Sequence, residues 1–446
     1  MFTPHHIDKN NIMTLPTGFI EMIQSLLGEE APQLLEALQS PPVTSVRLNT
    51  RKPGAAFPEA TSVKWCPTGF YLPERPVFTL DPLLHAGAYY VQDASSMIHR
   101  EVVTRLAAAP VTLLDMCAAP GGKTTAMIDA LPEGSRIVAN EYMPKRAAIL
   151  KENLTKWGYP LVSVTNRDSA FFAERGDQFD IVAVDAPCSG EGMMRKDEDA
   201  VKQWSPELIE RCAALQREIT SNAEKALRPG GYLIYSTCTF NRTENEEMAE
   251  YIRDSLGLIP VDMQFPEEWG IPRGINTDLP VYRFMPHRTE GEGLFLAVFR
   301  KPVDGEAYPP TTILTPHPID NSTHTVSMRP EPKQKIQAAA TKGKVAKESA
   351  GKGKDRFGKR DKKADTPLPE IEEILSIDFD RSLYPEADVD LPTALSYLRR
   401  ESITLSPDIP KGPVVVTYKG LPLGMAKNIG SRANNLYPKG WRILMR

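Results

Sequence analysis

The stretch VTLLDMCAAPGGKT at residues 111–124 joins a short apolar run to a glycine-containing loop that leads into a helical pattern. In this layout, a loop at the carboxyl end of a strand cradles a cofactor against the N-terminus of a helix. Further apolar runs of strand length follow, separated by helical patterns. We predict strands over residues 111–116, 136–140, 161–165, 179–185, 232–236 and 294–299. Alternating strands and helices indicate a doubly wound, Rossmann-like α/β domain with a parallel sheet and helices on its faces.

Two helices in this region carry boundary signals. Ser205 is a favourable N-cap, and Pro206 suits the first helical position. The pattern then runs to RPGG at residues 228–231, where proline and glycine predict its end. A second helix is expected further on, because Thr243 and Glu246 have the spacing of a capping box.

A chain of 446 residues is too long for one ordinary hydrophobic core, so several folded units are expected. A proline-, lysine- and glycine-rich segment low in apolar residues separates the last unit and predicts a disordered linker. We predict an N-terminal α+β region at 1–104, the doubly wound domain at 105–302, the linker at 303–372 and a small β-rich domain at 373–446.

The composition indicates an ordinary globular protein, with 41% hydrophobic and 25% charged residues. The formal net charge of -4 means that any nucleic acid must be bound by local basic patches. No run of about 18 apolar residues and no secretory signal are present, so we expect a cytoplasmic monomer without membrane contact. The five cysteines are scattered without metal-ligand spacing, so they predict neither disulfides nor a metal site.

Residues 117–124 come within one position of a phosphate-binding P-loop, because only Cys117 replaces its first glycine. A nucleotide hydrolase is therefore an alternative interpretation. Two features weigh against it. Pro120 has no N–H group to offer a phosphate. A P-loop also does not require an acidic residue after the next strand, where Glu141 stands.

Two carboxylates suit a nucleoside cofactor instead. Glu141 follows Asp115 by 26 positions and can accept hydrogen bonds from both ribose hydroxyls. Asp168 comes at the end of the third predicted strand, where its carboxylate could meet an adenine amino group. A plain turn or cap residue is the alternative for Asp168. The glycine pattern of a dinucleotide-binding dehydrogenase is absent.

DAPCSG at 185–190 and YSTCTF at 235–240 each place a cysteine just beyond the end of a strand. The fourth and fifth strands of a doubly wound sheet lie about 5 Å apart, so Cys188 and Cys238 should face the same crevice. This suits cytosine chemistry, because a thiolate that adds to carbon 6 makes carbon 5 able to attack a sulfonium methyl group. Asp185 could bind the N3 and N4 edge of the base and stabilise charge during addition. Burial of two structural cysteines is the alternative.

These motifs resemble those of the RNA cytosine-C5 methyltransferase family of the Sun/Fmu type. The resemblance covers about residues 40–301 and is carried by DMCAAPGGKT, NEYMPKRAAILKEN, RDS, DAPCSGEGMMRKD, STCTF followed by ENEE, and RFMPHRTEGEGLFLAVFRK. The final segment, GLPLGMAKNIGSRANNLYPKGWRI, resembles the PUA-like C-terminal domain of the bacterial 16S ribosomal RNA branch, the F type.

The resemblance implies an S-adenosylmethionine-dependent enzyme whose partner is RNA, expected to be ribosomal RNA or a ribosomal subunit. It implies Cys238 as the nucleophile and Cys188 as the residue that assists product release. The N-terminal region and the PUA-like domain are expected to bind RNA. Cofactor binding is implied for Cys117, Ala118, Ala119, Pro120, Gly121, Gly122, Lys123, Glu141, Asp168 and Asp185.

Two further alternatives concern the activity. A DNA cytosine-C5 methyltransferase would use the Pro-Cys cysteine as nucleophile and would not need the Thr-Cys cysteine, so the presence of both favours RNA. A catalytically silent assembly factor that binds ribosomal RNA is the other alternative, although every reacting group is present.

Several other residues have weaker expectations. Arg195 and Lys196 follow the Pro-Cys loop and could hold phosphates of the target strand, with a solvated charged turn as the alternative. Tyr89 and Tyr90 could stack on a base, with core packing as the alternative. Cys212 is expected in the apolar stripe of its helix.

Overall fold

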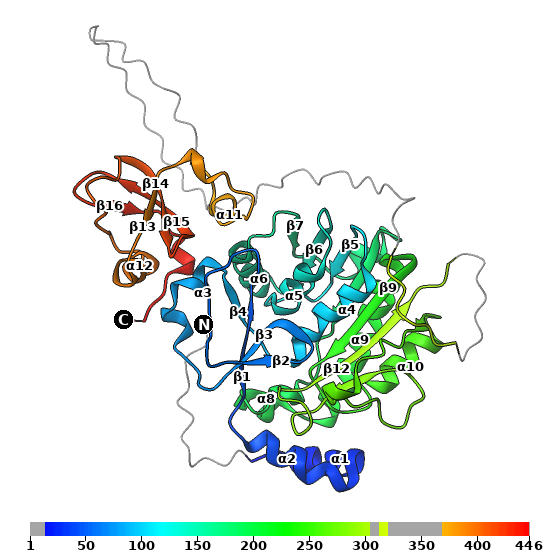
Figure 1. The fold of residues 1–446 in the computed structure, drawn as a ribbon. Helices are drawn as coiled ribbons and strands as arrows, with labels where there is room; N and C mark the ends of the chain where they lie inside the picture. Colours follow the sequence, from blue (N-terminus) through cyan, green and yellow to red (C-terminus); the bar gives the residue numbers. More distant parts are fainter. Residues whose placement is uncertain (1–13, 304–311, 320–367, 446) are drawn as a thin grey trace, which may run out of the picture.

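The computed structural model describes residues 14–303, 312–319 and 368–445. In these residues the strands form three sheets, which follow one another along the chain (Figure 1). The central sheet carries both cysteine motifs, so its construction positions the candidate site.

The central sheet has eight strands in the order β10-β12-β9-β8-β5-β6-β7, with β11 paired to β12. Strands β5 to β9 run parallel, and β10, β11 and β12 add antiparallel pairs, so the sheet is mixed. All six predicted strands are confirmed. The bounds are β5 Thr112–Asp115, β6 Arg136–Asn140, β7 Val162–Thr165, β8 Phe179–Asp185, β9 Leu227–Thr237, β10 Ile259–Pro260, β11 Tyr282–Phe284 and β12 Leu294–Arg300.

Helices cover both faces of this sheet, as the alternation of buried side chains along β8 requires. Ile181 and Ala183 pack on the face covered by α4, α5 and α6. Val182 and Val184 pack on the face covered by α7, α9 and α10. The bounds are α4 Ile98–Leu106, α5 Gly122–Ala130, α6 Pro144–Trp157, α7 Ala170–Ala173, α9 Pro206–Ala226 and α10 Glu246–Asp254.

Of the two predicted helix starts, the Ser205 cap is confirmed and the capping box is wrong. Ser205 caps α9, and its side chain accepts a hydrogen bond from the Leu208 amide, as predicted. The capping box of Thr243 and Glu246 is wrong, because α10 begins only at Glu246. The Glu246 carboxylate instead accepts a hydrogen bond from Nε of the buried Arg283 at 2.6 Å.

The N-terminal part forms an antiparallel sheet in the order β2-β3-β1-β4, preceded by two helices. In Figure 1, α1 and α2 lie next to α8, which follows the Pro-Cys motif. Phe19 and Ile23 of α1 share a hydrophobic cluster with Trp204 and with Phe240, two residues after Cys238. The bounds are α1 Thr17–Leu27, α2 Ala31–Gln39, β1 Thr44–Leu48, β2 Thr61–Val63, β3 Cys66–Leu72, α3 Pro82–Ala86, β4 Tyr89–Val91 and α8 Glu198–Gln203.

Arg47, which had no predicted role, fixes the N-terminal sheet to the helix that follows the cofactor loop. It is fully buried and forms an ion pair with Asp129 of α5. Its NH2 group donates to Thr125 Oγ1 at 2.5 Å, and its guanidinium lies 4.6 Å from the centre of the Trp157 ring. The N-terminal part is therefore a fixed wall beside the cofactor loop.

The C-terminal part forms a sheet in the order β13-β14-β15-β16, with α12 beside it. Lys52 of the N-terminal part joins it to the other two parts. The Lys52 ammonium donates to the carbonyl oxygens of Ala86, Lys156 and Leu375 at 3.1, 2.6 and 2.6 Å. These carbonyls lie at the C-terminal ends of α3, α6 and α11, where helix dipoles favour a cation. The bounds are α11 Ile371–Ile374, β13 Glu386–Asp388, α12 Leu391–Leu398, β14 Gly412–Tyr418, β15 Leu421–Asn428 and β16 Ala433–Asn435.

Most of the predicted linker lies outside the described residues. Residues 303, 312–319 and 368–372 of it are described. The prediction of disorder is wrong for residues 312–319 and for residues 371–372, which begin α11. Leu314 and Ile319 form isolated bridges with Val261 and Ala107. Ile319 is also buried. Apolar side chains in this stretch therefore pack on the central domain.

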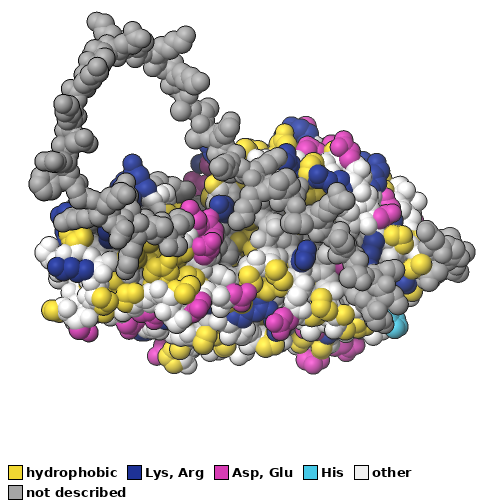
Figure 2. Space-filling model, turned by 90° about the horizontal axis from the view of Figure 1, so that it is seen from above, with side chains coloured by type: hydrophobic (Ala, Val, Ile, Leu, Met, Phe, Trp, Pro, Cys, Tyr) yellow, Lys and Arg dark blue, Asp and Glu magenta, His cyan; other side chains and the backbone are white. Residues whose placement is uncertain are grey.

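The described surface and helices add three observations. Basic and acidic side chains are interspersed among the coloured residues of the face seen in Figure 2. Within the described ranges, no helix is long and apolar enough to cross a membrane. The same residues contain no group of three or more His, Cys, Asp and Glu side chains placed to hold a metal ion.

Candidate active site

The two motif cysteines face each other at the carboxyl edge of the central sheet. Strands β8 and β9 are parallel neighbours, with Asp185 opposite Ser236. The loops that follow them bring Cys188 Sγ to 3.3 Å from Cys238 Sγ. The two cysteines therefore face each other as predicted, and neither of them is fully buried.

Direct contacts between the two loops fix this distance. The Gly192 amide donates to the Cys238 carbonyl oxygen at 2.9 Å. A Cβ added at Gly192 would lie 2.9 Å from that same oxygen, so only glycine allows the approach. The hydroxyls of Ser189 and Thr239 are hydrogen-bonded at 2.7 Å. The residue after each cysteine therefore contacts the residue after the other.

Two buried carboxylates, which the sequence did not single out, hold these loops. Glu191 accepts hydrogen bonds from the backbone amides of Phe240 and Asn241, at 2.6 and 2.9 Å. Glu244 accepts from the Ser189 amide at 3.0 Å and from the Asn241 side chain at 2.8 Å. Both glutamates lie inside quoted motifs. The only signal that could have found them is a carboxylate within a turn of otherwise small or polar residues.

The charges around the two sulfurs differ. The facing thiol of Cys238 and burial raise the pKa of Cys188 well above its usual range, and the nearby Glu244 carboxylate acts in the same direction. Cys238 instead lies within the field of the Lys123 ammonium. Burial acts to lower the pKa of Lys123, but the Asp185 carboxylate and Cys238 outweigh it, so its pKa is raised. This arrangement favours a protonated thiol at Cys188 and places a cation near the Cys238 sulfur.

Asp185 connects the sheet edge to both Lys123 and Ser236. Lys123 Nζ donates to Asp185 Oδ2 at 2.8 Å, so this lysine is part of the site rather than a solvated helix-start residue. The Ser236 hydroxyl lies 3.0 Å from Asp185 Oδ1 and can donate to it. The carboxylate is thus held at both oxygens, beside the two sulfurs.

His99, on helix α4, faces Ser236 from the other side. Its Nε2 lies 3.2 Å from Ser236 Oγ, and its Nδ1 lies 3.1 Å from the Ser96 carbonyl oxygen. A carbonyl only accepts, so Nδ1 carries the hydrogen of the neutral ring and Nε2 is an acceptor. Burial lowers the pKa of His99 to about 4, which keeps the ring neutral at neutral pH. The single hydroxyl proton of Ser236 can therefore serve His99 or Asp185, but not both.

The predicted cofactor loop lies between β5 and α5, at the point where the strand order reverses. Its carbonyl groups are bound by the protein: Arg146 donates to Ala119 O at 2.8 Å, and Asn153 donates to Pro120 O at 2.8 Å. Gly121 has φ 111° and precedes the helix as its N-cap. The first-turn amides of α5 have no partner within the helix, so they can face an anionic ligand.

Glu141 and Asp168 follow the next two strands along this edge. Glu141 Oε1 accepts from the Met143 amide at 2.8 Å, and Arg146 lies 3.3 Å from its other oxygen. Asp168 is exposed, and among the described residues its carboxylate accepts the local Ala170 amide alone, at 2.9 Å. Carboxylates at the ends of β6 and β7 beside a glycine loop suit the hydroxyl and amino groups of a nucleoside. These two carboxylates and the glycine loop therefore fit S-adenosylmethionine, which contains a nucleoside.

Four weaker expectations are corrected. Arg195 is not available to bind a phosphate, because its buried side chain forms an ion pair with Glu292, in which NH2 lies 2.8 Å from Oε1. Tyr89 is a core residue and is not available for base stacking. Tyr90 packs beside Trp157 and donates to Pro120 O at 3.2 Å. Cys212, which was expected in the same apolar stripe as Leu208, Leu215 and Ile219, is only half-buried; Leu215 is exposed, whereas Ile219 is buried.

Comparison with known protein families gives matches to three segments of the chain. A family model described as 16S rRNA methyltransferase RsmB/F matches residues 106–300. Models of the N-terminal domain of 16S rRNA methyltransferase RsmF and of the methyltransferase RsmF PUA domain match residues 15–94 and 384–443. Each segment contains one of the three sheets.

Curated relatives match the chain over nearly its full length. The ribosomal RNA small subunit methyltransferase F of Erwinia tasmaniensis is 32% identical, over 95% of this chain and 96% of its own. The protein of the same name from an Enterobacter species is 33% identical, over 96% of both chains.

Two solved structures share the fold of about two thirds of the chain. NSun6 from Pyrococcus horikoshii, with the S-adenosylmethionine analogue SFG, is 21% identical with a TM-score of 0.57, covering 66% of this chain and 100% of its own. A methyltransferase homolog from Pyrococcus horikoshii is 27% identical with a TM-score of 0.55, covering 65% of this chain and 96% of its own.

Proposed function

Since this chain belongs to the ribosomal RNA small subunit methyltransferase F family, we propose that it methylates carbon 5 of a cytosine in 16S ribosomal RNA, with Cys238 as the nucleophile. Members of the family are S-adenosylmethionine-dependent RNA methyltransferases, and membership excludes a nucleotide hydrolase as the interpretation of the cofactor loop. A cytoplasmic location, where bacterial ribosomal subunits assemble, belongs to the same proposal.

One observation carries the choice of carbon 5. Cys188 and Cys238 lie 3.3 Å apart, with a lysine ammonium beside one sulfur and a glutamate carboxylate beside the other. Methylation of an exocyclic nitrogen or a ribose oxygen needs no thiol. Addition to carbon 6 of a pyrimidine needs a thiolate, and the later elimination benefits from a second ionisable group close by.

The reaction begins with Cys238. Its thiolate forms a bond to carbon 6, and the electrons of the 5,6 double bond become available at carbon 5. S-adenosylmethionine supplies the methyl group that carbon 5 takes up. The C5–H bond then breaks, its electron pair restores the double bond, and the C6–S pair returns to Cys238. Cys188 assists this last step: its thiol, with the sulfur 3.3 Å from that of Cys238, gives its proton to the departing Cys238 sulfur, and the Cys188 thiolate so formed takes the proton from carbon 5.

Asp185 holds the base during these steps. Its carboxylate lies at the end of β8, oriented by Lys123, and can accept hydrogen bonds from the N3 and N4 edge of the base once that edge is protonated. When the Ser236 hydroxyl turns to His99, Asp185 Oδ1 gains the capacity to accept one more hydrogen bond. We assign Ser236 and His99 as positioning residues for Asp185.

The cofactor site uses the residues predicted for it. The loop from Cys117 to Lys123 would hold the amino-acid end against α5, Glu141 would accept from the ribose hydroxyls, and Asp168 would accept from the adenine amino group. When bound there, the cofactor would supply the methyl group, and Lys123, which donates to Asp185, would link the cofactor loop to the cysteine loops.

The proposal is tested by product analysis. The purified protein is incubated with methyl-labelled S-adenosylmethionine and 16S ribosomal RNA from a strain that lacks the gene, and the RNA is digested to nucleosides. Label in 5-methylcytidine is expected, and bisulfite sequencing then locates the cytosine. Label in any other nucleoside would contradict the choice of carbon 5. RNA binding without any label would instead indicate a silent assembly factor.

A further inference from the structure

A cavity of about 450 Å³ lies beside the Thr-Cys loop and belongs to none of the groups assigned above. Met22 and Leu26 of α1, together with Trp204 and Ile209, supply the apolar part of its lining. Arg242 forms the polar side. Its volume is in the range of small-molecule sites, which are typically apolar with a few fixed polar groups.

The wall contributed by α1 is a single helical face. Gly18, Met22, Ser25 and Leu26 line the cavity, and their spacing places them on one side of the helix. Gly18 has a specific consequence, because a Cβ at this position would lie 3.4 Å from the Trp204 ring. The missing side chain leaves an edge of the indole open to the cavity.

The cavity is lined by residues that follow the proposed nucleophile closely in the sequence. Asn241 and Arg242 line it and follow Cys238 by three and four residues. Three residues span at most about 11 Å, a distance that the nucleotides next to the target base can bridge. The hydrogen bonds from Phe240 N and Asn241 N to Glu191 keep this spacing constant. A ligand in the cavity would therefore lie at a fixed distance from Cys238.

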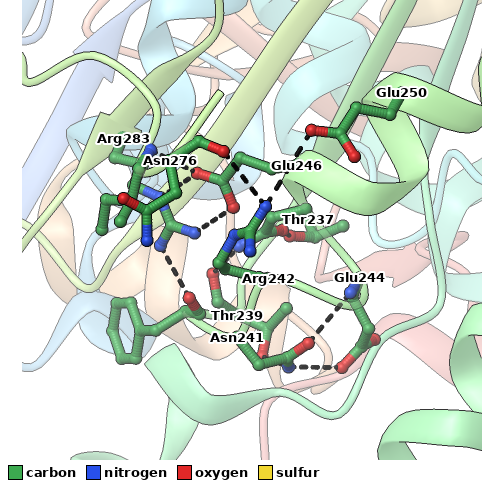
Figure 3. Close-up of polar contacts among 12 residues, drawn as sticks. Thr237, Thr239, Asn241, Arg242, Glu244, Glu246, Glu250, Asn276 and Arg283 are labelled. Atoms are coloured by element: carbon green, nitrogen blue, oxygen red, sulfur yellow. Dashed lines mark hydrogen bonds and ion pairs between the residues drawn. The ribbon is translucent and has the colours of Figure 1, made fainter. Parts of the chain in front are cut away.

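Arg242 has unused hydrogen-bonding capacity. Its NH2 group donates to the Asn276 carbonyl at 3.3 Å and lies 3.9 Å from Glu250 Oε1, as Figure 3 shows. Its Nε is buried and has no acceptor within the described residues. The neighbouring Arg283, by contrast, is fully used by Glu246 and Phe240 O. An acceptor on a ligand would satisfy the Arg242 Nε.

The lining matches one kind of ligand best. The apolar side chains and the indole edge suit the faces of an unpaired nucleobase, and the polar side chains beside them suit its edges. Arg242 suits its ring nitrogen or carbonyl acceptors, and the exposed Glu210 at the rim suits its amino donors. A single arginine facing a glutamate does not suit a free polyphosphate. The N-terminal helix that provides one wall then has a direct role in substrate choice.

We propose that this cavity binds an unpaired nucleobase of the substrate RNA next to the target cytosine, and so helps to select that cytosine. The proposal rests on the proposed function. It assigns to α1 and Arg242 a specificity role that is separate from the chemistry of the cysteines.

The test fills the cavity from its exposed rim. Ser25→Trp places an indole over the α1 wall, and Gln24→Trp places the same group on an exposed position of α1 that does not line the cavity. We expect Ser25→Trp to raise KM for RNA about tenfold or more, the loss typical of one unstacked base. We expect Gln24→Trp and the affinity for S-adenosylhomocysteine to stay at the wild-type level.

Abasic RNAs identify the occupant. One abasic residue is placed in turn at each position flanking the target cytosine. At one position the abasic residue should lower kcat/KM of the wild type about tenfold. The same abasic RNA should not lower kcat/KM of Ser25→Trp below its value on unmodified RNA. Arg242→Lys keeps the charge but removes Nε, so it should weaken binding to the unmodified RNA without changing the salt dependence.

The outcomes separate the two proposals. If wild type forms no 5-methylcytidine on unmodified RNA, the proposed function fails, whatever the cavity does. If wild type is active and Ser25→Trp behaves like Gln24→Trp on every RNA, the base site is overturned. An effect seen only on assembled subunits and not on naked RNA would also overturn it, since it would assign the cavity to a ribosomal protein.

Discussion

Cys188 Sγ lies 3.3 Å from Cys238 Sγ, at the ends of two neighbouring parallel strands whose loops are hydrogen-bonded to each other. The pair is built from buried groups rather than from a flexible loop, because Glu191 and Glu244 fix the backbone after each cysteine. Their electrostatic surroundings are unequal, with Lys123 near one sulfur and Glu244 near the other. This inequality gives the two sulfurs different chemical roles in the proposed reaction.

Replacing Lys123 should slow the step that depends on the Cys238 thiolate. Lys123→Met removes the positive charge near Cys238 and Asp185, so negative charge on the attacking sulfur is less stabilised. We expect at least a tenfold lower rate of adduct formation with RNA and a slower alkylation of Cys238 by iodoacetamide, measured by peptide mass spectrometry. Lys145→Met, an exposed change at the start of α6, is the control. An alkylation rate equal to that of wild type would remove Lys123 from the account.

The cofactor carboxylates can be tested by calorimetry with S-adenosylhomocysteine. Glu141→Ala and Asp168→Ala should each weaken binding by about 1.5 to 3 kcal/mol, because each removes a charge-assisted hydrogen bond. Glu174→Ala, an exposed acidic residue shortly after Asp168, should bind normally. Wild-type affinity in both site variants, with the fold intact by circular dichroism, would contradict the assignment.

Lys52 should decide how firmly the C-terminal part is docked. Lys52→Met removes the donor to three helix ends, and we expect faster hydrogen exchange at the Ile377 amide, which bonds to Gly158 O across the same boundary. Lys151→Met is the matched control, because its exposed ion pair with Glu372 crosses the boundary and is worth at most about 1 kcal/mol. Equal exchange in the two variants would show that Lys52 does not hold the interface.

A buried histidine predicts a loss of stability in acid. Burial lowers the pKa of His85 to about 4, while the unfolded chain titrates near 6.5. Between these values the unfolded state binds more protons, so the stability that neutral His85 contributes falls as pH drops from 7 towards 4. The stability advantage of wild type over His85→Gln should shrink by about 2 kcal/mol from pH 7 to pH 5 in urea unfolding. A constant difference across this range would contradict a neutral His85.

The sequence predicted the elements that depend on local patterns. Six of the eight strands of the central sheet, all except β10 and β11, were predicted because their apolar runs are bounded by turns. Ser205 with Pro206 marked the start of α9. The parallel order of β8 and β9 followed from the fold class and placed the cysteines together. The roles of the individual residues came from the resemblance to the family motifs, and these roles remain proposals.

Features that depend on long-range partners could not be predicted in this way. Glu246 has the spacing of a cap, but a buried arginine 37 residues away takes its carboxylate. The position of Arg195 after the Pro-Cys loop predicted a phosphate ligand, but its guanidinium forms an ion pair with Glu292 instead. The pairing of His99 with Ser236 spans 137 residues and leaves no local trace. In each case the decisive partner is set by packing and not by spacing.

The most direct test of the central claim compares two single substitutions under reducing conditions, since sulfurs this close can be oxidised to a disulfide. Cys238→Ala should form neither product nor a covalent complex, because carbon 6 is never attacked. Cys188→Ala should bind S-adenosylmethionine, transfer the methyl group once and then accumulate a protein–RNA complex that survives denaturing electrophoresis. A stable complex in Cys238→Ala and none in Cys188→Ala would make Cys188 the nucleophile and contradict the account.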